Sequence, residues 1–330
     1  MRAAAKPEGV SQWEGNGMGE DVLGHLKTRQ QIWARERGLK IDADGYCISC
    51  DANLFEPLSA CSRRDIGAGD GSELGKGGAR GKIQALHSSA ALACNFFDYW
   101  RGRDLGVLAR SLGISTRLCD MAFEQKFPTG LGGIAPNLDV VMFGCDGSLV
   151  AIESKFTEPF SKSKTKSILK PKYFPPDHGL WKDAGLSGCQ TLAEDLRDGR
   201  IQFVALDAAQ LLKHMLGLAF SGHPWSLMCL WYAPGEPFAD VHSEELGVFS
   251  QALGVDSKRF SAMTYQTLFD RLVLGPEHSE YAAYLRCRYF GGQLSEISTA
   301  AQCCGVNKVS NGSSVTLEGV SKKFGDVIAL

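Results

Sequence analysis

Two apolar runs in the middle of the chain, 138–143 and 149–155, are separated by the segment Gly-Cys-Asp-Gly-Ser at 144–148. Glycine and aspartate between apolar runs are a strong turn signal, so this pattern predicts a β-hairpin. Both faces of each strand carry apolar residues. A hairpin of this kind belongs in the centre of a sheet that helices cover on both sides.

Around the hairpin, apolar residues at helical spacing predict helices, and short apolar runs between turn residues predict strands. The expected helices are 20–38, 83–100, 105–112, 192–196, 203–220, 244–253, 265–274 and 279–289, and the expected further strands are 118–127 and 227–232. Segment 62–82 is rich in glycine and charge and is expected to be a long loop. This order of elements predicts an α/β fold with a central mixed sheet flanked by helices on both faces.

The same pattern divides the chain into five parts. Residues 1–19 are expected to be disordered, and residues 20–82 to form a helix and loop region. The core is expected in 83–235, a helical part in 236–304 and a tail in 305–330. In the tail, the last 16 residues resemble the opening strands of an ABC-type ATPase, without the phosphate-binding loop that follows them in that family. We therefore expect a fused or truncated fragment, with a native terminal hairpin as the alternative.

Two acidic residues, Asp139 and Glu153, interrupt the apolar hairpin strands, and their relative position depends on the turn. A two-residue loop would pair Asp139 with Ser154 and place Glu153 on the opposite face. A three-residue loop, 145–147, with Gly147 in the left-handed region sets Asp139 directly opposite Glu153. We predict the second arrangement, because that loop is common and favours glycine at its last position. Lys155 follows Glu153 by two residues and shares its face.

Two carboxylates and a lysine at one point of an apolar sheet cost desolvation energy. The simplest compensation is a hard divalent cation such as Mg²⁺, which prefers oxygen ligands. The ammonium group of Lys155 would then lie beside a reacting phosphate. The pattern thus predicts a metal-dependent phosphoryl-transfer site around Asp139, Glu153 and Lys155.

This arrangement resembles the PD-(D/E)xK nuclease superfamily, whose members carry an Asp on one strand and Glu-x-Lys on the next. The chain departs from the pattern in having two residues between Pro136 and Asp139. Further runs are similar to one branch of the superfamily, a family of restriction endonucleases. These runs are 69–74, 85–92, 95–98, 123–128 and 153–159, within a resembling region of roughly 40–290.

The resemblance implies a Mg²⁺-dependent endonuclease that hydrolyses DNA phosphodiester bonds and leaves a 5′-phosphate. Asp139 and Glu153 would hold one or two Mg²⁺ ions. The metal would activate water and offset charge on the transition state. Lys155 would position the attacking water or neutralise the phosphate. The implied partner is double-stranded DNA.

A further acid usually completes such sites in the superfamily, and Glu73 and Glu124 are both candidates. Either could instead cap a helix or face solvent. Gln210, one turn after Leu206, could hydrogen-bond near the metal, although a helical glutamine is usually a surface residue. Lys162, Lys164 and Lys166 are candidates for contacts with the DNA backbone, and a solvated lysine-rich loop is the alternative.

Composition narrows the class of protein. The 330 residues, of which 44% are hydrophobic, can bury a full core. No apolar run approaches the length of a membrane span, and the N-terminus lacks an apolar signal core. Eleven scattered cysteines favour reduced thiols in a cytoplasm. The pair at Cys47 and Cys50 lacks the partners of a zinc site, which favours free thiols.

Three alternatives concern function and assembly. A repair or recombination nuclease could use the same core, and a non-catalytic module could retain it only for binding DNA. The net charge of −2 disfavours nonspecific coating of nucleic acid but allows a local basic groove. Cutting a duplex needs two scissions, so we also consider a homodimer with one site in each subunit.

Overall fold

The computed structural model describes residues 18–161, 168–235, 240–291, 323–324 and 327–328. The chain divides into two units, Met1–Gly291 and Gly292–Leu330. In the second unit, β6 (Lys323–Phe324) pairs antiparallel with β7 (Val327–Ile328). The resemblance of the tail to an ATPase start and the five proposed parts of the chain stay predictions. Of residues 1–19, which were expected to be disordered, 1–17 lie outside the described residues. The prediction was wrong for 18–19, which form the start of α1 (Met18–Glu36).

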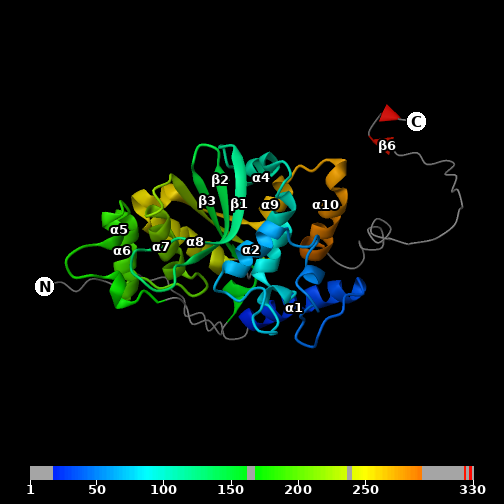
Figure 1. The fold of residues 1–330 in the computed structure, drawn as a ribbon, viewed down its shortest axis with the longest axis horizontal. Helices are drawn as coiled ribbons and strands as arrows, with labels where there is room; N and C mark the ends of the chain where they lie inside the picture. The colour runs from blue at the N-terminus through cyan, green and yellow to red at the C-terminus, as the bar shows by residue number, and fades with distance from the viewer. Residues whose placement is uncertain (1–17, 162–167, 236–239, 292–322, 325–326, 329–330) are drawn as a thin grey trace, which may run out of the picture. The chain divides into compact units, whose positions relative to one another are not determined.

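The first unit is built around a five-stranded sheet in the order β1-β2-β3-β4-β5 (Figure 1). Its strands are β1 (Leu118–Lys126), β2 (Asn137–Gly144), β3 (Leu149–Lys155), β4 (Trp225–Trp231) and β5 (Phe260–Thr264). The first three strands run antiparallel, and β3, β4 and β5 are parallel. The α/β class and the mixed sheet are therefore confirmed.

Ten α-helices are described in these ranges. They are α1 (Met18–Glu36), α2 (Ala60–Ala68), α3 (Ser89–Phe97), α4 (Leu105–Leu112), α5 (Leu180–Asp183), α6 (Ser187–Arg197), α7 (Ala208–Ala219), α8 (Asp240–Ala252), α9 (Tyr265–Arg271) and α10 (Ser279–Leu285). In Figure 1 the strands lie between a group containing α5, α6 and α7 and a group containing α4, α9 and α10. This arrangement favours helical cover of both faces, which stays a prediction.

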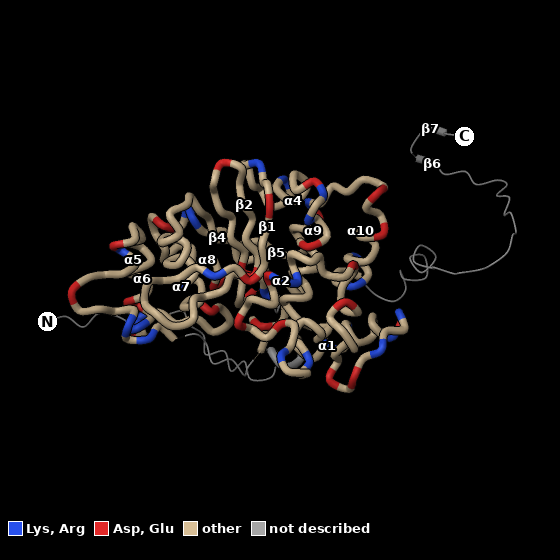
Figure 2. Tube along the Cα trace, in the orientation of Figure 1, with Lys and Arg blue, Asp and Glu red and all other residues tan. Residues whose placement is uncertain are grey.

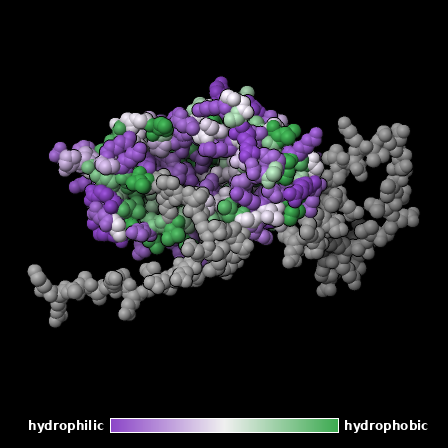
Figure 3. Space-filling view, turned by 90° about the horizontal axis from the view of Figure 1, so that it is seen from below, coloured by the Kyte–Doolittle hydropathy of each residue, from purple (hydrophilic) through white to green (hydrophobic). Residues whose placement is uncertain are grey.

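The hairpin of β2 and β3 is apolar and buried on both faces. Val140 and Ile152 on one face, and Val141 and Ala151 on the other, are all fully buried. Helix α3 packs against both strands, and α7 packs against β4. On the face shown in Figure 3, hydrophilic residues prevail and hydrophobic ones form small groups. No helix in the described ranges is long and apolar enough to cross a membrane.

Two expected elements were wrong in part. The segment 62–82 was expected to be a loop, but its first residues belong to α2. Ser59 stabilises the start of this helix by accepting a hydrogen bond from Ser62 N at 3.1 Å. The helix expected over 83–100 starts only at Ser89. The chain before it forms a 3₁₀ turn at Lys82–Gln84 and a second turn, in which Ser88 N donates to Ala85 O at 3.0 Å. Ser88 accepts from Ala91 N and thereby fixes the helix start.

Strand β5 was also missed. It is five residues long and directly precedes α9, whose start at Tyr265 was expected. Only Phe260 of the strand is buried, and the next two residues are exposed. Such a short, half-exposed segment lacks the alternation by which strands are recognised in sequence.

A buried arginine, Arg288, joins the two ends of the first unit. Its guanidinium donates to Asn53 O at 2.7 Å, to Asn53 Oδ1 at 2.6 Å and to the Tyr284 hydroxyl at 2.6 Å. It also donates to Gln30 Oε1 at 3.2 Å and lies 4.4 Å from the ring of Trp33 in α1. The charge is thus compensated by polar oxygens and an aromatic face.

We expect Arg288→Met to lower the free energy of unfolding by about 2–4 kcal/mol, because it leaves buried oxygens without donors. Arg110→Met, at an exposed position of α4, should change it by less than about 0.5 kcal/mol. Urea denaturation of the three proteins measures both effects. Equal stability of wild type and Arg288→Met would show that the contacts of Arg288 with Gln30, Asn53 and Tyr284 do not stabilise the fold.

Candidate active site

The turn of the β2–β3 hairpin has the predicted geometry. Gly144 N donates to Ser148 O at 2.8 Å, which leaves a three-residue loop, and Gly147 has a φ of 81°. Val140 pairs with Ile152 in the strand register. Asp139 therefore lies directly opposite Glu153, as the loop length predicted.

A third acid extends this pair into a row across the sheet. The register of β1 and β2 pairs Phe123 with Val140 and Gln125 with Leu138, so Glu124 lies opposite Asp139. Glu124, Asp139 and Glu153 thus occupy matching positions on three adjacent strands. Figure 2 shows acidic positions gathered where the central strands end beside α2. Glu124 has a φ of 51°, a strained conformation for a side chain of this size.

Glu153 is 2% exposed and has two cationic or polar neighbours. Its Oε1 lies 2.6 Å from Lys155 Nζ, and its Oε2 lies 3.0 Å from Nε2 of the buried His214. The second contact is close but is not aligned as a hydrogen bond. Burial opposes ionisation of Glu153, but the charge of Lys155 and the contact with His214 outweigh it and lower its pKa to about 2.

Lys155 is held in its charged form for a related reason. Burial favours the neutral amine, but the carboxylate of Glu153 outweighs this effect, and the pKa of Lys155 is raised. Glu158 and Asp139 contribute in the same direction. The ammonium also donates to Gln210 Oε1 at 2.9 Å. Lys155 and Glu153 therefore form a buried ion pair with further acids around it.

Asp139 and Glu124 are the two acids of the row whose ionisation is disfavoured. Burial and the charge of Glu153 raise the pKa of Asp139 well above its usual value, although its Oδ2 accepts from Ser154 N at 2.6 Å. Burial and the charge of Glu73 raise the pKa of Glu124 to about 7. One lysine cannot neutralise this set of acids, so the site favours bound protons or a bound cation.

Glu73, the other candidate for a third acid, lies near the same row. Its side chain is 14% exposed, its Oε1 lies 3.7 Å from Lys82 Nζ, and burial raises its pKa. Gly69 and Gly71 lie close to the side chains of Glu124 and Glu73. A Cβ at Gly69 would lie 3.0 Å from Glu124 Cβ, and one at Gly71 would lie 2.8 Å from Glu73 Oε1. The structure places both candidates beside the row, and the choice between them stays open.

Sequence reasoning missed two residues of this cluster. His214 lies four residues after Gln210 on α7, so the contacts of Gln210 with Lys155 and of His214 with Glu153 come from one helix face. That spacing was a usable signal. Glu158 accepts from Phe156 N at 2.8 Å and lies in the run 153–159 that carries the family resemblance.

The remaining sequence candidates are placed less fully. Lys162, Lys164 and Lys166 lie outside the described residues. Cys47 is a buried free thiol and Cys50 a half-buried one. Across the described ranges, no three His, Cys, Asp or Glu side chains stand close enough to form a ready-made metal site. This does not conflict with Mg²⁺, which keeps several waters and often takes only one or two carboxylates.

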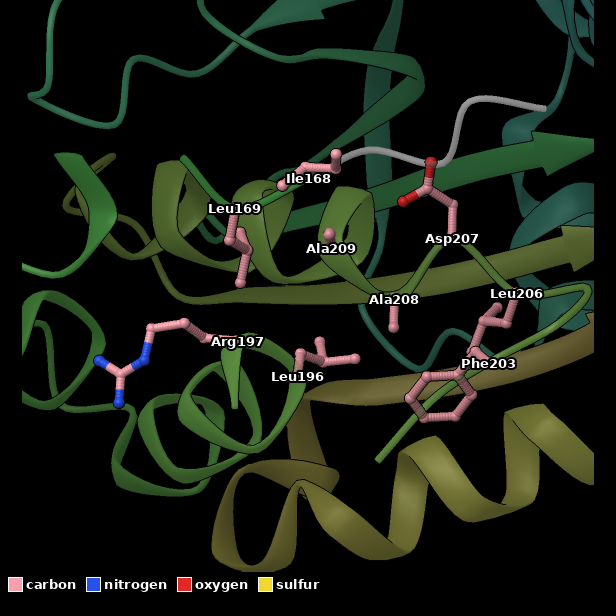
Figure 4. A pocket seen from close by; sticks show the side chains of 9 residues that line it. All are labelled: Ile168, Leu169, Leu196, Arg197, Phe203, Leu206, Asp207, Ala208 and Ala209. Atoms are coloured by element: carbon pink, nitrogen blue, oxygen red, sulfur yellow. The ribbon is translucent and has the colours of Figure 1, made fainter. Parts of the chain in front are cut away.

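A pocket elsewhere in the unit is a poor candidate for the active site. It has a volume of about 250 Å³ and lies between α6 and the start of α7 (Figure 4). Its walls are mainly apolar, and Arg197 and Asp207 are the charged residues that line it. None of the acids of the row lines it. The acidic row is therefore the better candidate for an active site than this pocket.

An α/β fold whose mixed sheet carries an acidic row and a lysine is consistent with a nuclease-like core. Residues 27–290 match the family described as "Restriction Endonuclease associating with ARP". This covers most of the chain, which therefore belongs to that family. The family points to a nuclease role with DNA as the substrate. No curated protein and no solved structure gives a significant match.

The raised pKa of Glu124 predicts a pH-dependent stability. The folded protein retains the proton up to about pH 7 and the unfolded chain loses it near 4.5, so stability falls as the pH rises between these values. Without divalent cations, we expect Glu124→Gln to gain about 1–3 kcal/mol relative to wild type between pH 5 and pH 8. Glu280→Gln, at an exposed position, should gain nothing. Chemical denaturation at both pH values measures this, and parallel pH profiles for wild type and Glu124→Gln would refute it.

Proposed function

We propose that this protein is a Mg²⁺-dependent endodeoxyribonuclease of the restriction type, built on a PD-(D/E)xK core. The observation that supports it most directly is the pair of opposed carboxylates, half-buried Asp139 and buried Glu153, with Lys155 Nζ 2.6 Å from Glu153. Membership of a restriction endonuclease family gives independent support. The reaction is hydrolysis of a DNA phosphodiester, in which water adds to phosphorus and the bond to the 3′-oxygen breaks.

The donor set fits Mg²⁺. The acids of the row are oxygen ligands, and the raised pKa values of Asp139 and Glu124 show that their charges lack compensation. Asp139 and Glu153 would hold the ion, with Glu124 or Glu73 as a further ligand. When bound, the metal would activate water and stabilise negative charge on the phosphate.

The residues of the chain supply orientation and charge. Lys155 remains an ammonium, because Glu153 and Glu158 raise its pKa, and it would neutralise a phosphate oxygen or position the attacking water. Gln210 holds that ammonium from α7. His214 limits the rotation of the Glu153 carboxylate from the same helix. These contacts would keep the reacting groups in place before DNA arrives.

Three further aspects belong to this proposal. Cys94, Cys189 and Cys229 are buried free thiols, which suits a cytoplasmic enzyme. The substrate would be double-stranded DNA. A homodimer would bring one site to each strand of the duplex.

The decisive test is incubation of unmethylated plasmid with the protein, with and without Mg²⁺. Wild type should nick or cut only with the metal. Asp139→Asn and Glu153→Gln should each lower the rate on the order of 100–1,000-fold, because each removes a charged ligand from the transition state. Glu280→Gln, an exposed change, should cut like wild type.

Circular dichroism and duplex binding serve as controls. Both active-site variants should remain folded and bind duplex at least as tightly as wild type, since each removes negative charge near the phosphates. Failure of wild type to cut any DNA with Mg²⁺ would overturn the enzyme proposal. Full activity of folded Glu153→Gln would overturn the assignment of the site.

A further inference from the structure

A glycine-rich turn, residues 130–133, lies next to the acidic row in the chain. It joins β1, which carries Glu124, to β2, which carries Asp139. Gly130, Gly132 and Gly133 have φ values of 77°, 67° and 86° and are exposed. A Cβ at Gly130 or Gly132 would meet no atom within 4 Å. The backbone of this turn is therefore accessible, and its shape depends on glycine.

Lysines from two other segments gather beside this turn. Lys172 Nζ donates to Gly132 O at 2.7 Å and lies 5.8 Å from the centre of the Tyr173 ring. Lys213, on α7, places its Nζ 5.9 Å from the same ring. Burial lowers the pKa of Lys213, Asp207 opposes this effect, and the charges of Lys170 and Lys172 lower it further. The ammonium groups of Lys170 and Lys172 are thus close enough to act on that of Lys213.

The lysine-bearing segment is held firmly against the unit. Tyr173 is buried and stacks on Trp181, with their ring centres 5.7 Å apart. The ammonium of Lys172, in the same segment, donates to Gly132 O and joins this segment to the turn. The segment that carries Lys170 and Lys172 is therefore packed against the unit and bonded to the turn.

These lysines have no carboxylate within ion-pair distance in the described ranges, although Asp207 acts on Lys213 from further away. In the described part of the chain, Arg63, Arg80 and Arg200 each pair with at least one carboxylate. Within the same ranges, Lys170, Lys172 and Lys213 form no ion pair. Like charges that are held together with little compensation from carboxylates are unfavourable, and a bound polyanion removes this cost.

We propose that the turn 130–133, together with Lys170, Lys172 and Lys213, forms a cradle for the phosphate backbone of DNA beside the cleavage site. The identity of the polyanion rests on the proposed nuclease function. The cradle is connected to the site, because Lys213 directly precedes His214 on α7 and the turn separates Glu124 from Asp139. Lysine contacts to phosphates position DNA without reading its sequence.

The test is the salt dependence of duplex binding, measured by fluorescence anisotropy without Mg²⁺ so that no cleavage occurs. Lys170→Met/Lys172→Met should reduce the slope of log Kd against log salt by about 1.8, since each lost phosphate contact removes about 0.9. Lys213→Met should reduce it by about 0.9. These reductions should be equal for unrelated duplex sequences.

The matched control is Lys40→Met/Lys258→Met, which removes two exposed lysines from other parts of the unit. It should bind with the slope of wild type. An unchanged slope in Lys170→Met/Lys172→Met would overturn the cradle, and so would an equal reduction in the control. Circular dichroism checks that each variant is folded.

The outcomes separate this inference from the proposed function. If wild type binds duplex with a lysine-dependent slope but does not cut with Mg²⁺, the cradle stands and the nuclease proposal fails. If wild type cuts but its slope does not depend on these lysines, the nuclease proposal stands and the cradle fails.

Discussion

The burial of Glu153 in an apolar sheet is the constraint on which the rest of the site depends. A carboxylate that is 2% exposed must be compensated by groups within a few ångströms. Lys155, from the same strand, supplies a charge, and His214 approaches the other oxygen from α7. The position of α7 against the sheet therefore serves both packing and electrostatics. Helix α7 in turn brings Gln210 to Lys155, so one helix restrains both members of the ion pair.

The central hairpin could be predicted from sequence because local chemistry determines it. Loop length and the glycine at 147 fix the register, and the register alone sets Asp139 opposite Glu153. The longer strands and helices followed from apolar spacing for a similar reason. Helix α4 was predicted to the residue, since an apolar stripe is bounded by capping Asp104 and left-handed Gly113.

The missed features depend on contacts between distant segments. His214 reaches Glu153 across 61 positions of sequence, and nothing near His214 marks it except its spacing from Gln210. Helix α2 is largely polar, so its stability comes from its cap and from packing on β1. The placement of Glu73 near Glu124 depends on the small size of Gly69 and Gly71, which a single sequence cannot reveal.

The junction at Arg288 has a consequence for how the chain reaches its final form. Helix α1 is synthesised before its partner, because the guanidinium that bonds to Gln30 follows more than 250 residues later. At about 5–20 residues per second, synthesis leaves this helix without that partner for tens of seconds. Synthesis must therefore reach Arg288 before α1 can make all of its native contacts. A nascent chain that ends before Arg288 would therefore lack this closure of α1 onto the segment that follows α10.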